Sequence, residues 1–191
     1  MSRIILHSTM TFDGVVSDVE KWASITDEII DDAYDYYRNI DALLFGGNTF
    51  DGMAGYWTVA EKESASPSEK RFAVRMGEMM KYSVTDRQRI AAWKNSAILD
   101  SSSDAALIAG VERLRQQHPN GVSLETGIRT WQRFLRLGLY NELMIYVQSV
   151  IAGDGTKLFS VDGPQIPLTL LSSRTFKNGT VRFHYRRTDR M

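Results

Sequence analysis

Short runs of apolar residues recur along the chain and are separated by longer stretches with helical spacing. A strand that is covered on both faces needs no alternating polar positions, so a continuous apolar run such as 143–147 predicts a buried strand. On this pattern we expect strands at residues 3–8, 42–45, 82–85, 97–99, 121–124 and 143–147. Most of the stretches between them place apolar side chains every three or four residues, which is typical of helices with one buried face.

The helical spacing predicts four helices, at residues 26–39, 69–80, 103–117 and 128–137. Thr26, Ser68 and Ser103 (or Asp104) are expected to cap the first three, because their side-chain oxygens can accept the unpaired N–H groups of a first turn. Gly138 is expected to end the fourth, since glycine adopts the left-handed conformation without a Cβ penalty.

The 26–39 helix also carries a row of acids. Its apolar stripe is expected to be buried, so the acids opposite are predicted to face solvent: Asp31, Asp32 and Asp35. Asp27 or Asp31 could instead face a cleft.

Two further segments have a local signature. Residues 61–70 are hydrophilic and predict a surface excursion that could act as a mobile lid. Strands at 168–171 and 180–185 flank Asn178-Gly179, which predicts a hairpin with a type I′ turn. Alternation within the second strand divides it into an inward and an outward set, namely Val181, Phe183 and Tyr185 against Arg182, His184 and Arg186.

The order of these elements is strand and helix in repetition, followed by an antiparallel hairpin. This order predicts an α/β fold, with a mostly parallel central sheet and an antiparallel C-terminal hairpin at one edge. The length of 191 residues suits one domain over residues 1–191.

Composition narrows the class of protein. Lysine plus arginine and aspartate plus glutamate number 23 each, and this balance argues against nucleic-acid binding. The chain has no cysteine, which excludes disulfides, thiolate nucleophiles and zinc–cysteine sites. It shows neither a signal peptide nor an apolar run near the roughly 20 residues of a membrane span. We therefore expect a cytoplasmic protein that does not enter a membrane.

Three turns at predicted strand ends are candidates for chemistry. Gly46-Gly47-Asn48-Thr49 and Thr126-Gly127 each follow a strand, and Thr126-Gly127 precedes a helix whose first N–H groups could bind an anion. Asp13-Gly14 would place a carboxylate at the carboxyl end of the first strand. Each of these is equally compatible with an ordinary turn.

The histidines give little indication of chemistry. They are far apart in the sequence and lack metal-ligand spacing, so no metal site is expected. His7 is predicted to be a core or barrel-side residue, His118 to end a helix, and His184 to point outward.

Four pieces taken together resemble a known family. They are Thr11-Phe12-Asp13-Gly14, the turn at 46–50, Gly127 before its helix, and the segment 139–159 with Ala152-Gly153-Asp154-Gly155-Thr156-Lys157-Leu158-Phe159. In this order they resemble the dihydrofolate reductase-like family, and most closely the C-terminal reductase domain of the bifunctional riboflavin biosynthesis protein. The resemblance covers nearly the whole chain. It implies the three-layer dihydrofolate reductase-like fold, a homodimer, and an NADPH-dependent reductase in riboflavin biosynthesis or a related pathway.

The resemblance also implies a site. The substrate would be a small pterin or ribosylaminopyrimidine-like molecule, as for 5-amino-6-(5-phosphoribosylamino)uracil reductase or dihydrofolate reductase. Asp13 matches the family's Asp-Gly carboxylate and would be catalytic. Thr85 and Arg87 would reach the adenosine ribose and the 2′-phosphate. The other expected cofactor-binding residues are Gly46, Asn48, Thr49, Thr126, Gly127, Arg129 and Gly153.

The sequence departs from the family pattern at three positions. Gly47 stands where a basic residue is common. Thr126-Gly127 stands where a double glycine is usual, and Glu125 precedes it. The missing charge, the added Cβ and the added carboxylate all oppose phosphate binding, although Arg87, Arg89 or Arg129 could compensate. The alternative is a non-catalytic or altered-ligand protein that keeps the fold and binds another nucleotide-like small molecule.

Overall fold

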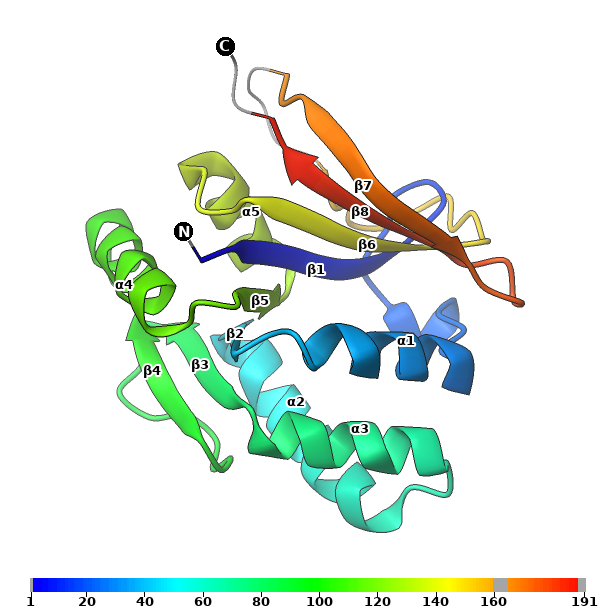
Figure 1. Cartoon of the computed structure of the whole chain (residues 1–191), viewed down its shortest axis with the longest axis horizontal. Helices are drawn as coiled ribbons and strands as arrows, with labels where there is room; N and C mark the ends of the chain where they lie inside the picture. The colour runs from blue at the N-terminus through cyan, green and yellow to red at the C-terminus, as the bar shows by residue number, and fades with distance from the viewer. Residues whose placement is uncertain (1, 160–164, 189–191) are drawn as a thin grey trace.

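The backbone is organised around one eight-stranded sheet, shown in Figure 1. The computed structural model describes residues 2–159 and 165–188. The strand order is β4-β3-β2-β5-β1-β6-β8-β7. The strands are β1 (Ile4–Thr11), β2 (Ala42–Gly46), β3 (Met80–Thr85), β4 (Ser96–Asp100), β5 (Val122–Glu125), β6 (Glu142–Gln148), β7 (Leu168–Thr175) and β8 (Val181–Arg187).

The first six strands in this order are parallel to their neighbours, whereas β8 pairs antiparallel with β6 and β7 antiparallel with β8. The predicted α/β fold with a mostly parallel sheet and an antiparallel C-terminal hairpin is therefore confirmed. All carboxyl ends of the parallel strands lie along one edge, where ligands bind in open α/β sheets.

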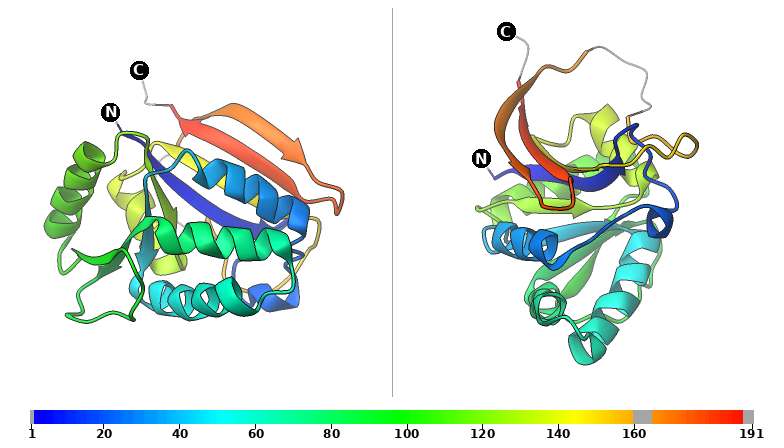
Figure 2. Two further views of the ribbon diagram at one scale, coloured as in Figure 1. Left: turned by 60° about the horizontal axis from the view of Figure 1, so that its bottom comes forward. Right: turned by 90° about the vertical axis from the view of Figure 1, so that its right-hand side faces the viewer.

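In the part of the chain that the structure describes, five α-helices cover the sheet on both faces (Figure 2). They are α1 (Asp27–Tyr37), α2 (Gly47–Glu63), α3 (Pro67–Glu78), α4 (Asp104–Gln117) and α5 (Ile128–Leu137), and a short 3₁₀ turn lies at Val19–Lys21. Side chains of α4 and α5 pack in one core, and those of α1, α2 and α3 in the other. Among the described residues, no helix is long and apolar enough to cross a membrane.

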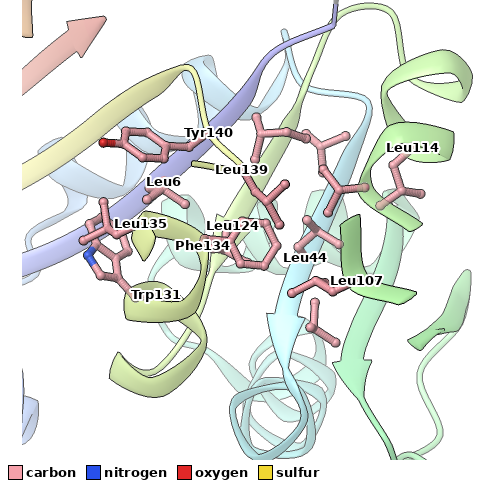
Figure 3. Close-up of a cluster of buried hydrophobic side chains, with 14 of the residues drawn as sticks. Leu6, Leu44, Leu107, Leu114, Leu124, Trp131, Phe134, Leu135, Leu139 and Tyr140 are labelled. Carbon is pink, nitrogen blue, oxygen red and sulfur yellow. The ribbon is translucent and has the colours of Figure 1, made fainter. Parts of the chain in front are cut away.

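The core under α5 shows why this helix begins and ends where the sequence predicts. Trp131, Phe134 and Leu135 lie on one helix face and are buried against Leu6 and Leu124 of the sheet, as Figure 3 shows. The helix ends at Gly138, whose φ of 66° is the left-handed conformation expected of a C-terminal glycine.

Helix α2 was not predicted, and its presence corrects the interpretation of residues 61–70. Gly47, Gly52 and Gly55 obscure its helical pattern, because glycine is a poor helix former. The hydrophilic residues belong to the end of α2 and the start of α3, so only 64–66 connect the two helices. Ser66, and not Ser68, caps α3 by accepting the N–H of Glu69. Residues 61–70 lie at the surface as predicted, but as two helix ends and a three-residue connection.

Asp32 was predicted to face solvent, but it is buried with 5% exposure. Its carboxylate accepts hydrogen bonds from Arg182 on β8, Arg174 on β7 and the Tyr146 hydroxyl on β6. The C-terminal hairpin therefore covers α1 at Asp32, on the face that the sequence pattern predicts to be polar. Paired with two guanidinium groups, a buried carboxylate is tolerated.

The same packing corrects the outward assignment of Arg182 and His184 on β8. The Arg182 side chain is 17% exposed and meets Asp32, and that of His184 is 16% exposed and meets the buried Glu142 at 2.8 Å. Burial opposes ionisation of Glu142, but His184 and Arg3 outweigh it and hold its pKa below the usual value.

The predicted C-terminal hairpin is confirmed, but its turn is not of type I′. A type I′ turn needs positive φ at Lys177 and Asn178, whereas the positive φ lies at Gly179 (84°). Asn178 instead uses its side chain: its amide group donates to Ser24 O and its oxygen accepts from Thr180 N–H.

Lys81 is the second residue of β3, and it is fully buried. Its Nζ donates to the carbonyl oxygens of Met76, Gly77 and Met79, at 2.8, 3.0 and 2.6 Å, and so satisfies the C-terminal end of α3. Burial, with a smaller effect of Lys94, lowers the pKa of Lys81 to about 8.

We expect Lys81→Met to lower the free energy of unfolding by about 3 kcal/mol, because three buried carbonyl oxygens lose their donor. Urea denaturation measures this, with Lys70→Met, an exposed lysine on α3, as the control. Between about pH 8 and 10.5 the unfolded wild-type chain binds more protons than the folded one, so wild-type stability should rise relative to the variant with pH. Equal stability of Lys81→Met and Lys70→Met would contradict the capping role.

Candidate functional site

Two helices begin side by side at the carboxyl edge of the sheet. Helix α2 starts at Gly47 directly after β2, and α5 starts at Ile128 directly after the Thr126-Gly127 turn that follows β5. Strands β2 and β5 are neighbours in the sheet, so the two helix N-termini converge. The first turn of each helix carries unpaired N–H groups and the positive end of the helix dipole.

The two helix starts are tied by reciprocal hydrogen bonds. The Gly46 N–H donates to Thr126 Oγ1 at 2.9 Å, and the Gly127 N–H donates to Thr49 Oγ1 at 3.0 Å. A Cβ at Gly46 would lie 2.6 Å from Thr126 Oγ1, so this close approach requires glycine. Thr126, whose side chain departs from the family pattern, therefore has a hydroxyl that is used to join the two loops.

Arg87 lies beside the start of α2. A Cβ at Gly47 would lie 2.7 Å from one of its terminal guanidinium nitrogens, so the guanidinium occupies the space that a larger residue at position 47 would need. Asp51 holds this side chain at 2.8 Å, and the Thr85 hydroxyl accepts from its Nε at 3.3 Å. Position 47 itself carries no charge, but Arg87, in the loop that follows β3, places a positive charge beside it.

The remaining predicted cofactor residues divide between this cradle and another loop. Asn48 and Arg129 are exposed in the first turns of α2 and α5. Gly153 belongs to the 149–157 loop, where its N–H donates to Asp13. We use "cradle" below for Gly46, Gly47, Thr49, Thr85, Arg87, Thr126 and Gly127.

A cavity of about 480 Å³ adjoins the cradle and shares Thr49, Thr126 and Gly127 with it. Helices α1, α2 and α3 supply its apolar wall. The side chains from these helices are Ile29, Ile30, Ala33, Tyr37, Met53, Trp57, Phe72 and Met76. Such a concave, mostly apolar space with a few polar groups is typical of a small-molecule site.

The ionisable pair in the cavity wall is His7 with Glu125, register partners on β1 and β5. His7 Nδ1 lies 2.6 Å from Glu125 Oε2, and the Ser123 hydroxyl donates to Glu125 Oε1 at 2.5 Å. The imidazole stacks on Tyr36 and contacts Tyr146 edge-on, with ring centroids 5.5 and 5.4 Å apart. His7 is therefore part of the cavity wall as well as of the packing around it.

Tyr146, also in the cavity wall, is fixed from behind. Its hydroxyl donates to the buried Asp32, and burial together with the Asp32 charge raises its pKa far above the usual value. The phenol therefore stays protonated, and its ring presents a rigid aromatic surface to the cavity.

Asp13, the predicted catalytic carboxylate, lies outside the set of residues that line the cavity. Its carboxylate accepts from Lys157 Nζ at 2.8 Å, from the Thr11 hydroxyl at 2.6 Å and from the N–H groups of Ala152 and Gly153, both at 3.0 Å. These bonds, that of Lys157 foremost, hold its pKa well below the usual range. The contacts describe a clamp that joins the loops after β1 and β6.

Comparison with known proteins identifies the family. The model of the RibD C-terminal domain family matches residues 2–182. The chain belongs to this family. Uncharacterized protein YyaP of Bacillus subtilis (strain 168) is 25% identical over 186 residues, which cover 96% of this chain and 94% of that protein.

Solved structures show the same fold. A Shewanella sp. PV-4 protein described as a candidate riboflavin biosynthesis protein aligns with a TM-score of 0.73, at 15% identity, over 98% of this chain and 99% of its own. Dihydrofolate reductase from Enterococcus faecalis, complexed with NADP(H), aligns with a TM-score of 0.59, at 12% identity, over 98% and 97%. The predicted dihydrofolate reductase-like, RibD-type family is confirmed.

The sequence interpretation of this RibD-type chain brought the cradle residues together but missed the cavity pair. His7 was predicted to be a core or barrel-side residue, and Glu125 was considered only as a repulsive charge. The available signal was their position: both are polar residues next to apolar runs on strands that prove to be neighbours. Among the described residues, no group of three or more His, Asp or Glu side chains could hold a metal ion.

We expect Asp13→Asn to speed amide hydrogen exchange at Ala152 and Gly153 by about tenfold, because the amide group cannot accept all the bonds that the carboxylate accepts. Exchange over residues 149–159, followed by mass spectrometry or NMR, measures this. Asp18→Asn, an exposed change in the neighbouring 3₁₀ segment, is the control. Unchanged exchange would contradict the clamp, and combined with lost turnover it would support the predicted catalytic role.

Proposed function

We propose that this RibD-type chain is an NADPH-dependent reductase of a pterin or ribosylaminopyrimidine-like small molecule. The observation that carries the proposal is the cradle: two convergent helix N-termini and Arg87 beside a 480 Å³ apolar cavity. Helix N-termini and guanidinium groups both favour phosphate, and a shielded apolar space suits a nicotinamide ring next to a planar substrate.

The residues present fit this cofactor. In the proposal, the N–H groups of the first turns of α2 and α5 face the pyrophosphate, and Gly47 lets the backbone approach it closely. Arg87 neutralises the 2′-phosphate and Thr85 orients Arg87. The Glu125 carboxylate, which would repel phosphate, is turned to His7 and Ser123.

NADPH, when bound, supplies the hydride. The work of the chain itself is to hold cofactor and substrate in contact and to exclude water, since hydride transfer depends mainly on alignment. The apolar wall from α1, α2 and α3 excludes water, and Tyr146, fixed by Asp32, keeps the wall in place.

We expect purified protein to bind NADPH with quenching of tryptophan fluorescence, because Trp57 lies in the cavity wall. Arg87→Gln should weaken NADPH binding by about 10- to 100-fold and leave NADH binding unchanged, because a guanidinium–phosphate contact contributes roughly 1.5–3 kcal/mol. Arg38→Gln, an exposed arginine at the end of α1 and outside the cradle, is the matched control.

Two outcomes would contradict this assignment. Equal losses for NADPH and NADH in Arg87→Gln would move Arg87 from the 2′-phosphate to the pyrophosphate. Absence of binding by both cofactors in the wild-type protein would reject the reductase and favour the altered-ligand alternative.

We also propose that the protein is a homodimer. Strand β7 lies at the edge of the sheet, and its apolar side chains Leu168, Leu170 and Leu171 are 40%, 50% and 38% exposed. A long apolar edge strand exposed in this way is prone to pair with another chain.

We expect Leu170→Lys to convert the dimer to a monomer without unfolding it, because the lysine would be buried between two copies. Light scattering coupled to size-exclusion chromatography measures the mass. Ile108→Lys, which changes an exposed isoleucine on α4, should leave the dimer intact. A wild-type protein that is monomeric at all concentrations would reject the dimer.

A further inference from the structure

The cavity wall contains a carboxylate and no lysine or arginine side chain. Among the described residues that line it, none is lysine or arginine, and the ionisable groups are His7, Glu125 and the two phenols Tyr37 and Tyr146. The Glu125 and His7 side chains are 12% and 14% exposed, so the carboxylate is well shielded from water.

Several cations elsewhere in the fold are paired with carboxylates of the chain. Arg174 and Arg182 pair with Asp32 behind Tyr146, at 2.8 and 2.7 Å. Lys157 is clamped to Asp13 at 2.8 Å, and Arg87 pairs with Asp51 at the cradle. Arg174, Arg182 and Lys157 therefore each neutralise a carboxylate of the chain itself, whereas Arg87 lies at the cradle, outside the cavity wall.

A phosphate group would be poorly accommodated in such a cavity. Moving a dianion from water into an apolar space is costly unless a cation and hydrogen bonds compensate, and the Glu125 carboxylate adds repulsion. Hydrogen-bond donors, by contrast, are favoured, because a carboxylate accepts about four hydrogen bonds and Ser123, His7 and Tyr37 engage three.

Resting on the proposed reductase function, we propose that the substrate is a planar nitrogen heterocycle without a phosphate group, and that Glu125 recognises its ring N–H or amino groups. The aromatic side chains Tyr37, Trp57 and Phe72 in the cavity wall provide flat surfaces for such a ring. This substrate class differs from the phosphoribosyl substrate that the resemblance to riboflavin biosynthesis reductases implies.

His7 is a positioning residue in this arrangement. Its ring is held between Tyr36 and Tyr146, and its Nδ1 contact fixes the Glu125 carboxylate. Its Nε2 is buried without a hydrogen-bond partner among the described groups. In the proposal the ring orients Glu125 through Nδ1, and the carboxylate is the group that receives the hydrogen bonds of the ligand.

The test uses a matched pair of probes, 6-hydroxymethylpterin and its phosphate monoester, which differ only in the phosphate. Binding of each to the full-length protein is measured by calorimetry without cofactor, and NADPH binding is measured separately. We expect the phosphate ester to bind about tenfold or more weakly than the free pterin. Glu125→Gln should weaken binding of the free pterin by about tenfold or more, because it replaces an acceptor-only group by an amide.

Glu112→Gln on α4, an exposed acid outside the cavity wall, is the control and should leave both affinities unchanged. Equal or tighter binding of the phosphate ester, or an unchanged affinity in Glu125→Gln, would overturn the proposal. Binding of NADPH with no binding of either pterin would reject the substrate class and leave the cofactor role standing. If the free pterin binds and NADPH does not, the substrate class stands and the cofactor role is rejected.

Discussion

The pair of hydrogen bonds between the loops after β2 and β5 sets the geometry of the whole carboxyl edge. Thr126 accepts from Gly46 and Thr49 accepts from Gly127, so each helix start is completed by a hydroxyl from the other loop. Because the N–H groups at Gly46 and Gly127 are used in this way, the next N–H groups of both helices remain available to a ligand. The cavity depends on the same bonds, since its boundary at this edge is formed by Thr49, Thr126 and Gly127.

Local patterns in the sequence predict most of the sheet and one helix to the residue. The α5 range is given by apolar spacing and by Gly138, because both signals lie within the segment itself. Helix α2 was missed for the converse reason: its three glycines lower its intrinsic helix propensity, and its stability comes from burying Phe50 and Ala54 against the sheet.

The candidate site could be predicted only where the family resemblance carries it. The cradle follows from glycine turns at strand ends, which are visible in one sequence. Asp32 and its partners Tyr146, Arg174 and Arg182 are 114 to 150 residues apart, and nothing near Asp32 marks it as buried. Arg87 was named from the resemblance as one of three arginines that could compensate for Gly47, but its position beside Gly47 depends on the pairing of β2 with β3.

The central position of β1 has a consequence for how the chain is made. Strand β1 leaves the ribosome first, but its two partners β5 and β6 are synthesised more than 110 residues later; His7 and Glu125, for example, are 118 residues apart. At roughly 5–20 residues per second, the apolar segment Ile4-Ile5-Leu6 waits without its native neighbours for several seconds or longer. The order of synthesis thus exposes an apolar segment that the finished molecule buries completely, and a nascent chain of this kind is a natural client of chaperones.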